Sequence, residues 1–346
     1  MSFNFQVDKK EQFIIPKQNK YRYASNKYSK EVLYHRSFRD NVSNNTKNYE
    51  ALEKVGKGGA SSVYKGVDND TGKEIIIKEL KTANLSKLIR EVNILTVSKG
   101  IKHVVPLIDF FKNSDVYYLV FPYLKVEQTR AVFYKFSRIE IKVFMYKFLE
   151  TIDKLHAKGV IHRDLKPGNL LVKSCTDFYI IDFGISDFYL PFRNFCTKIG
   201  TRNFKAPEQL IGIKGFDYGI DVWAVGVMFA EMLFQKFPFW PPEEDIVTLE
   251  NICKMTGTDK FDEFLDFFKI KEKYNFIENV KNKNPTPLKK YNQREPNDNI
   301  YKDFDDAIDL LEKMLEINPL KRINAKDTLK HKYFQELFQT EYDFNP

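Results

Sequence analysis

The stretch from His162 to Asn169 concentrates the residue types that phosphoryl transfer requires. Asp164 supplies a carboxylate that can accept or orient the proton of an attacking hydroxyl group, and Lys166 can stabilise charge on the transferring group. Asn169 offers an oxygen ligand for a metal, and so does Asp182, which opens an Asp-Phe-Gly run eighteen residues after Asp164. Each residue alone has an ordinary structural explanation, but their order and spacing indicate one site.

A glycine-rich run and a lysine lie upstream of these acids. Glycines between Gly56 and Val63 let backbone N–H groups approach phosphate oxygens without a Cβ in the way, although a plain hairpin turn has the same composition. Lys78 ends a β-branched run, and a lysine on a buried strand needs an anion. Glu91, on a predicted helix, can supply one carboxylate and ATP phosphates the rest. The alternative is a lysine at the exposed end of a strand.

These four motifs, in this order, resemble the signature set of the eukaryotic protein kinases. Further runs extend the resemblance over roughly residues 49–336: Ala206-Pro207-Glu208, Asp221-Val222-Trp223 with Gly226, and Arg322. The resemblance implies an α+β, two-lobed protein kinase fold, with a small, mainly antiparallel β lobe that carries one helix and a larger, mainly α lobe. It also implies ATP and Mg²⁺ in the site, and a pairing of Glu208 with Arg322 that ties the activation segment to the large lobe.

The resemblance assigns roles to individual positions of this chain. The catalytic residues that it implies are Asp164, Lys166, Lys78 and Thr201, and the metal ligands are Asn169 and Asp182. The residues that it places around the nucleotide are Val55, Gly56, Lys57, Gly58, Gly59, Ala60, Ser61, Ser62, Val63, Ile76, Lys78, Glu91, Pro122, Leu124 and Leu171. Ser61 replaces the usual third glycine of the loop, and Ile76 replaces the usual alanine and is expected to narrow the adenine pocket.

Hydrophobic periodicity predicts the elements that must position these residues. The small lobe, residues 49–123, is predicted to contain a hairpin over Val55–Gly66, strands at 75–78, 103–110 and 116–122, and a helix at 84–97. The large lobe, residues 124–336, begins with a predicted helix at 139–158 and carries a Lys/Asn/Pro-rich surface insertion at about 271–299. Residues 1–48 are interpreted as a polar tail, disordered or laid against the domain, and 337–346 as a C-terminal tail.

Lys166 and Thr201 resemble the pattern of Ser/Thr kinases rather than tyrosine kinases, and two families within that class compete. The cell division control protein seven kinases, which act in the cell cycle and the initiation of DNA replication, are similar to five runs of this chain. These runs are Ser61–Lys65, the Pro122-Tyr123 hinge, Gly200-Thr201-Arg202 ahead of Ala-Pro-Glu, Ile220–Trp223 with Gly226-Val227, and Glu244–Leu249. This chain lacks the long insertions usual in that family.

The casein kinase II catalytic subunit is the alternative family. Asp187–Pro191 and Phe234–Phe239 resemble it. It has tryptophan where Phe183 stands and glycine where Ala206 stands. A third alternative is a pseudokinase scaffold, which normally lacks the lysine, the catalytic aspartate or the metal-binding aspartate, whereas this chain has all three.

Both families prefer acidic substrates, and a basic triplet offers a physical reason. Lys198, Arg202 and Lys205 lie in the segment that is expected to flank the residue after the phosphoacceptor. The alternative is that they cap backbone groups or bind a phosphate on the activation segment. Thr197 stands at a common position for an activating phosphate, which Arg163 could receive. Constitutive activity, with tail residues Tyr28–Phe38 packed on the activation segment as in casein kinase II, is the other reading.

Composition narrows the partners that we expect. No run of 18 apolar residues occurs, which argues against a membrane span, and the first residues lack an apolar signal core. Three cysteines without metal-like spacing are typical of reduced thiols in an intracellular protein. The net charge is +8, but no compact Lys/Arg run with interleaved aromatics predicts direct nucleic-acid binding. The resemblance suggests a nuclear location and leaves a regulatory subunit open as a partner.

Overall fold

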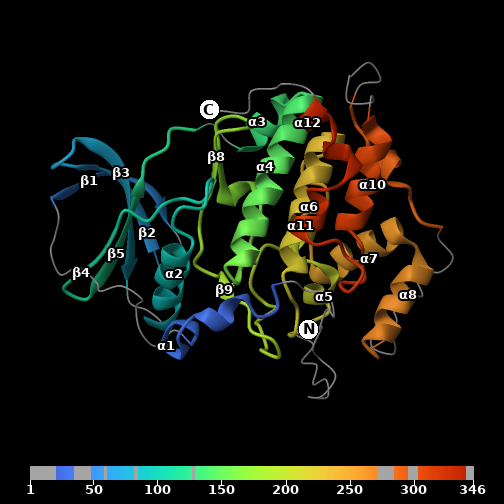
Figure 1. The fold of residues 1–346 in the computed structure, drawn as a ribbon, viewed down its shortest axis with the longest axis horizontal. Coiled ribbons are helices and arrows are strands. Elements are labelled where there is room, and N and C mark those ends of the chain that lie inside the picture. The colour runs from blue at the N-terminus through green and yellow to red at the C-terminus, as the bar shows by residue number, and fades with distance from the viewer. Residues whose placement is uncertain are drawn as a thin grey trace.

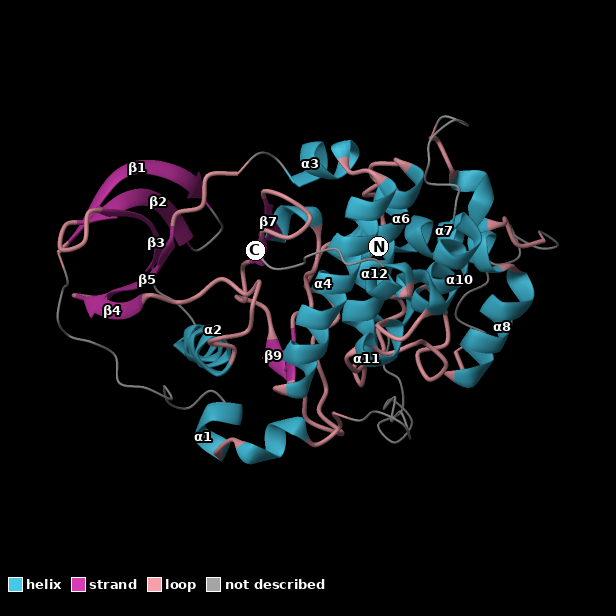
Figure 2. Cartoon of the chain, turned by 45° about the horizontal axis from the view of Figure 1, so that its top comes forward, coloured by secondary structure: helices cyan, strands magenta, loops and turns pink. Residues whose placement is uncertain are grey.

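The structure is a computed structural model that describes residues 21–34, 48–57, 61–81, 85–126, 129–270, 284–294 and 303–339. Within these ranges a β-sheet gathers at one end of the molecule and a bundle of helices at the other (Figure 1). The two regions differ sharply in secondary structure, as Figure 2 shows by colour. This arrangement confirms the predicted two-lobed α+β fold.

The small lobe is one antiparallel sheet with the strand order β1-β2-β3-β5-β4. Alternation along the third strand explains its two faces, because Ile75 and Ile77 are buried on one side while Ile76 and Lys78 point to the other. A single helix packs beside the sheet and buries its apolar stripe. The bounds are β1 Tyr49–Lys57, β2 Ser61–Asp68, β3 Lys73–Lys81, α2 Leu85–Val97, β4 Asp109–Asn113 and β5 Val116–Pro122.

The strand predicted at 103–110 is wrong, because regular pairing begins only at Asp109. His103 adopts a left-handed backbone conformation with φ of 66°, and Pro106 has no N–H to donate to a ladder. Val104 forms an isolated parallel bridge with Ile180 of the large lobe instead. The apolar residues of this stretch therefore connect the lobes rather than extend the sheet.

The large lobe is built around two long helices, α4 (Arg138–Ala157) and α6 (Gly219–Phe234). The predicted helix at 139–158 is confirmed as α4, whose first turn is capped by Glu140, which accepts hydrogen bonds from the N–H and hydroxyl of Ser137. Nearly every side chain of α6 is buried, as expected for a helix that is apolar on all sides. The other helices are α3 Thr129–Lys135, α5 Pro207–Leu210, α7 Asp245–Thr256, α8 Thr258–Phe267, α10 Phe304–Met314, α11 Ala325–Thr328 and α12 Glu336–Gln339.

Short strands and single 3-10 turns shape the loops between these helices. Two small antiparallel pairs are formed by β6 (Val160–Ile161) with β9 (Asp187–Phe188), and by β7 (Leu170–Val172) with β8 (Phe178–Ile180). The 3-10 turns in the large lobe are η2 Pro167–Asn169, η3 Arg202–Phe204, η5 Leu288–Tyr291 and η7 Lys332–Phe334. The predicted insertion at 271–299 is described only over 284–294, where Leu288 and Arg294 are buried.

A segment of the predicted N-terminal tail lies against the domain. Residues 21–34 form η1 (Ala24–Lys27) and α1 (Lys30–Leu33), which packs against α2 below the sheet (Figure 1). The Tyr21 hydroxyl donates to Asp153 at 2.8 Å, and the Ser25 hydroxyl donates to the carbonyl of Gly159 at 3.1 Å. The rest of the predicted tail lies outside the described residues. The segment 21–34, called the N-terminal segment below, thus touches both lobes.

The end of the described chain is also packed. Glu336 forms ion pairs with Arg138 at 2.6 Å and with Lys142 at 2.5 Å, both on α4. Leu337 is buried, although the predicted C-terminal tail begins there. In the described part of the chain we find no helix that is both long enough and apolar enough to cross a membrane.

Candidate active site

The loop that carries Asp164 is fixed from below by a buried carboxylate of α6. Asp221 accepts hydrogen bonds from the backbone N–H groups of His162 at 2.8 Å and Arg163 at 2.9 Å, and lies 3.1 Å from Nε2 of His156. Burial by itself raises the pKa of the Asp221 carboxyl, but the bond to His156 and the other nearby donors hold that pKa below its ordinary value. An ionised Asp221 thus holds the loop in place, including the left-handed backbone of Arg163.

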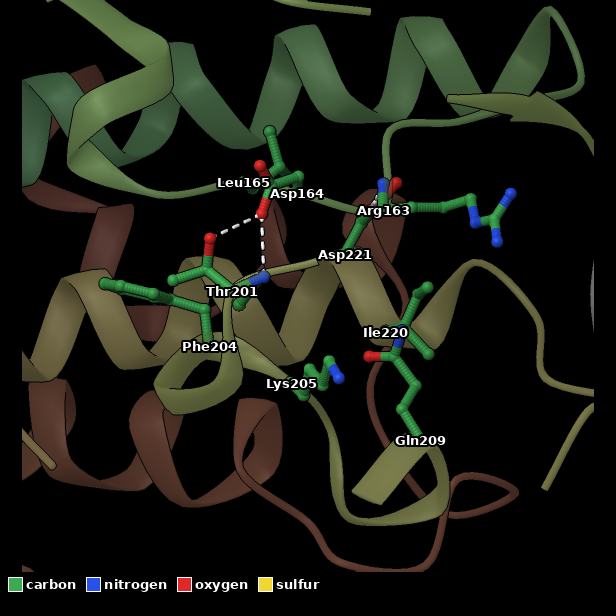
Figure 3. Close-up of a pocket in the computed structure, with 10 residues that line it drawn as sticks. Arg163, Asp164, Leu165, Thr201, Phe204, Lys205, Gln209, Ile220 and Asp221 are labelled. Atoms are coloured by element: carbon green, nitrogen blue, oxygen red, sulfur yellow. Dashed lines mark hydrogen bonds between the residues drawn. The ribbon is translucent and has the colours of Figure 1, made fainter. Parts of the chain in front are cut away.

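Four donors surround the carboxylate of Asp164. Oδ1 accepts from the N–H of Thr201 at 2.9 Å and from its hydroxyl at 2.7 Å, and the two residues face each other in Figure 3. Oδ2 lies 2.9 Å from both the Lys166 ammonium and the Asn169 amide nitrogen. Lys166 also donates to the Thr201 hydroxyl at 2.7 Å. The structure therefore joins these four sequence-predicted residues in one hydrogen-bonded network.

This network has a mechanical consequence for catalysis. A carboxylate offers about four lone-pair directions, so a substrate hydroxyl can reach Asp164 only when one of the four donors moves. Lys166 is the flexible one, since its side chain is 28% exposed and its ammonium stands on a four-carbon stem. Movement of Lys166 would leave one acceptor site of Asp164 free for a hydroxyl group.

The predicted pairing of Lys78 with Glu91 is present. The two charged groups lie 2.6 Å apart, and the Lys78 ammonium is also 3.4 Å from Asp182. Burial by itself lowers the pKa of the Lys78 ammonium, but the two carboxylates outweigh this effect and raise the pKa above its ordinary value. Lys78 is therefore a charged group at the inner face of the sheet, and the reading of it as a surface lysine is wrong.

Asp182 is presented outward from the Asp-Phe-Gly run. Its side chain is 52% exposed, its backbone is left-handed with φ of 60°, and its Oδ1 accepts from the N–H of Gly184 at 3.3 Å. Burial raises the pKa of this carboxyl, but Lys78 and the Gly184 N–H outweigh burial and hold the pKa below its ordinary value. An ionised, accessible carboxylate is what a hard cation requires.

The oxygen atoms at the site fit Mg²⁺ together with a nucleotide. In the ranges that the structure describes, no group of three or more His, Cys, Asp or Glu side chains could hold a metal ion. Mg²⁺ needs few protein ligands, because it keeps water and takes phosphate oxygens from its substrate. The Asn169 amide nitrogen donates to the carbonyl of Asp164 at 2.8 Å, so its Oδ1 remains the atom that could accept a metal ion.

Sheet register places part of the predicted nucleotide-binding set on one face. Gly56 is opposite Val63, Val63 is opposite Lys78, and Ile76 is opposite Phe121, so all five share the face that carries Lys78.

Other members of the predicted set lie elsewhere. Lys57 and Ser62 oppose each other on the other face, so only their backbone groups can meet a phosphate. Val55 is exposed at a register shift of β1. Four members are half-buried: Ser61, Pro122, Leu124 and Leu171. Three members lie outside the described residues: Gly58, Gly59 and Ala60.

Three arginines surround one carboxylate of the activation segment, an arrangement that the sequence motifs did not indicate. Asp187 of β9 lies 3.5 Å from Arg90, 3.4 Å from Arg163 and 3.0 Å from Arg193. Arg163 also donates to the carbonyl of Cys196 at 2.9 Å. Burial lowers the pKa of Arg163 to about 10, with Asp187 opposing the change. The predicted receiver of a Thr197 phosphate is thus already paired with an internal carboxylate.

The predicted basic triplet is only partly exposed. Lys198 and Arg202 are exposed, and Arg202 lies 3.7 Å from Asp245 of α7. Lys205 is buried in a small internal pocket that Asp164 also lines (Figure 3). Burial lowers the pKa of the Lys205 ammonium, with Asp245 opposing. The expectation of three surface cations is therefore corrected to two, since Lys205 packs beneath the segment.

The activation segment ends in a buried ion pair. Both terminal nitrogens of the Arg322 guanidinium group donate to Glu208, at 2.7 and 2.9 Å, and the two side chains are fully buried. Arg322 also donates to the carbonyl of Glu316 at 2.9 Å and lies over the ring of Trp223. The implied pairing of Glu208 with Arg322 is present in the structure.

A two-lobed fold with a lysine–glutamate pair, an oriented aspartate and a second, accessible aspartate is typical of a phosphotransferase of the protein kinase class. Comparison with known families agrees: residues 49–334 match the protein kinase domain, and the chain belongs to that family. It is also 33% identical over 299 residues to a probable serine/threonine-protein kinase of Dictyostelium discoideum. That alignment covers 86% of this chain and 49% of the relative, so the chain spans about half the relative's length.

Replacing Lys78 by methionine is expected to reduce phosphoryl transfer by about 100-fold or more, because the nucleotide phosphates lose their cation. The fold should persist, since methionine keeps most of the stem, although Glu91 loses its counter-ion and some stability with it. Peptide phosphorylation and thermal unfolding of the same sample measure both effects. Full turnover in the variant, or loss of the native fold, would contradict the assignment.

The arginine cluster leads to a prediction about activation. Because Asp187 already occupies Arg163, Thr197→Ala is expected to leave activity within about twofold of wild type in enzyme expressed in bacteria. Deletion of residues 1–46 removes the N-terminal segment that packs against α2. Activity is expected to fall about tenfold, which corresponds to a loss of about 1.4 kcal/mol in the free energy that holds α2 in its active position. The reverse outcome, with Thr197→Ala crippled and the deletion active, would show that a phosphate activates the chain.

Proposed function

We propose that this chain is an active protein kinase that transfers the γ-phosphoryl group of ATP to serine or threonine residues of protein substrates. The observation that carries the proposal is the simultaneous presence of the Lys78–Glu91 pair and the Asp164–Lys166–Thr201 network. One group faces the phosphates and the other faces the attacking hydroxyl. Transfer of labelled phosphate from ATP to a Ser/Thr peptide by the purified chain tests it, and a Mg²⁺ omission control tests the metal.

The residues divide the work as follows. Asp164, held by Thr201 and Asn169, orients the substrate hydroxyl and takes up its proton. Lys166 moves with the transferring group and offsets its charge, while Lys78 neutralises the remaining phosphates. Asp182 and Asn169 would hold Mg²⁺, which would supply positive charge to the phosphates. Absence of any transfer from ATP under these conditions would favour the pseudokinase alternative.

We further propose that the substrate carries acidic residues next to the phosphoacceptor. Support comes from Lys198 and Arg202, which are exposed on either side of Thr201 in the sequence. Because Arg202 is 58% exposed and near Asp245, solvent screens its charge and limits its contribution. The preference is therefore smaller than a buried triplet would give.

Wild-type enzyme is expected to favour Asp, Glu or phosphoserine over alanine after the target residue by about three- to tenfold in kcat/KM. Replacing both Lys198 and Arg202 by alanine should flatten this preference and lower its sensitivity to salt. A positional peptide array, read with and without candidate regulatory subunits, measures it. A wild-type preference for proline or arginine at that position would overturn the proposal.

The finer assignment remains a proposal from the resemblance. We propose the cell division control protein seven family, because Phe183 and Ala206 differ from the tryptophan and glycine of casein kinase II. Both residues are buried, and Phe183 packs edge-on against His162 with ring centroids 4.9 Å apart. A nuclear location and a role in the cell cycle follow from the same resemblance. Imaging of the tagged chain and rescue of a strain that lacks such a kinase test them.

A further inference from the structure

A cavity of about 670 Å³ adjoins the catalytic network on the large lobe. Lys166 and Thr201, which contact Asp164, line one side of it, and Phe204, Pro238 and Pro242 form an apolar part of its wall. Arg130 of α3 lines it as well. Because the cavity shares residues with the network, a side chain that enters it belongs to a substrate residue close in sequence to the phosphoacceptor.

A buried carboxylate lies behind Arg130. Glu231 of α6 is fully buried and does not line the cavity, whereas the Arg130 side chain is 46% exposed. Glu231 Oε1 accepts from Arg130 at 3.3 Å and from the N–H of Phe239 at 3.3 Å. Among the described residues, no donor reaches the buried Oε2. Arg130 therefore stands between this carboxylate and the space that a substrate would enter.

Arg130 and Glu231 differ in burial and in how many of their hydrogen-bonding groups are used. Burial raises the pKa of the Glu231 carboxyl to about 7, and Arg130 and the Phe239 N–H oppose the rise. A guanidinium has five N–H donors, and the described contact with Glu231 uses one of them. The remaining donors are available on the exposed part of Arg130, so the cavity meets a substrate with positive charge while the negative charge stays covered.

We propose that Arg130 is a specificity-determining residue that covers Glu231 and excludes basic substrate side chains from the cavity. The inference rests on the proposed kinase activity, which it refines by naming a second selective position. With Arg130 in place, the cavity accepts apolar or acidic side chains and rejects lysine and arginine by like-charge repulsion. Without Arg130, Glu231 becomes a carboxylate at the base of an open cavity, where it can pair with a substrate cation.

The test compares peptide libraries in which each position near the target carries arginine, alanine or glutamate, assayed from about pH 7 to about pH 9 because Glu231 attracts a cation only when it is ionised. Each rate is divided by the same variant's rate on the alanine peptide. Arg130→Ala is expected to raise the arginine-to-alanine ratio about tenfold at one position. Arg130→Lys keeps the charge and should keep the wild-type ratio. If Arg130→Ala is unstable, Arg130→Met retains the aliphatic stem and takes its place.

A second substitution separates specificity from general disturbance. The double variant Arg130→Ala with Glu231→Gln should lose the gain for arginine, because the uncovered group then carries no charge. An unchanged ratio at every position in Arg130→Ala, or a gain that survives Glu231→Gln, would overturn the inference. If the enzyme shows no preference for acidic residues next to the phosphoacceptor, only the proposal about Lys198 and Arg202 fails. The proposal about Arg130 is unaffected, because its test compares rates on arginine and alanine peptides.

Discussion

Asp164→Asn is expected to lower phosphoryl transfer by about 100-fold or more while nucleotide affinity changes little. The amide of asparagine cannot take up the substrate proton. In addition, one carboxylate oxygen of Asp164 now accepts from both Lys166 and Asn169, and an amide puts an N–H donor in place of one of the two carboxylate oxygens. Asp164 belongs to the network that faces the hydroxyl and makes no described contact with Lys78. Single-turnover rates with saturating peptide measure the loss, and titration of Mg-ATP measures the affinity.

Asp182→Asn is the matched comparison for this result. Asp182→Asn should lower phosphoryl transfer to a similar extent. It should also weaken Mg-ATP binding, because the metal loses an ionised oxygen ligand beside Lys78. The weakening should disappear when nucleotide binding is measured without the metal. An equal loss of nucleotide affinity in both variants would contradict the separate roles that the geometry assigns to the two aspartates.

Arg322→Met is expected to destabilise the domain by about 3–5 kcal/mol, since it leaves the fully buried carboxylate of Glu208 without its partner. Denaturant unfolding, monitored by fluorescence of the buried Trp223 beside Arg322, measures the change. The exposed pair of Glu150 and Lys154, 3.0 Å apart on α4, provides the control, and Lys154→Met should change stability by less than about 0.5 kcal/mol.

A double substitution checks the cause of that loss. Glu208→Leu together with Arg322→Met removes both charges, so it should cost less than Arg322→Met alone if the unpaired carboxylate is responsible. A double variant that is less stable than the single one would indicate that the hydrogen bond from Arg322 to the Glu316 carbonyl matters more than the charge of Glu208.

The parts of the fold that sequence predicted are those specified by local pattern. Alternation around Ile75–Ile77 and the helical spacing of Leu88, Val92 and Leu95 both identify their buried face without knowledge of any partner. The stretch 103–110 has a similar apolar content but connects the lobes. Its exception arises from His103, whose left-handed backbone is stabilised by a ring nitrogen 3.0 Å from the carbonyl of Phe178, seventy-five residues later.

The active-site residues were predictable for a different reason. Lys78, Asp164 and Asp182 stand in motifs whose spacing carries the information, so no tertiary contact is needed to find them. Asp187 and Glu231 carry no such signal, because their importance comes from arginines elsewhere in the chain. Lys205 was predicted to be a surface cation but is buried. Its sequence neighbours do not distinguish a buried lysine from an exposed one.

The N-terminal segment has a consequence for the order in which this enzyme is made. The Tyr21 hydroxyl donates to Asp153, which is synthesised 132 residues later. The Tyr21 carbonyl accepts from Tyr218, and these two residues are separated by the longer interval of 197 residues. At a synthesis rate of about 5–20 residues per second, that interval lasts about 10–40 s. During it the N-terminal segment lacks its contact with Tyr218, whereas α2, against which α1 packs, has already been synthesised. A nascent chain therefore completes the attachment of the N-terminal segment to the large lobe only after Tyr218, just ahead of α6, has been synthesised, and shorter chains lack that contact.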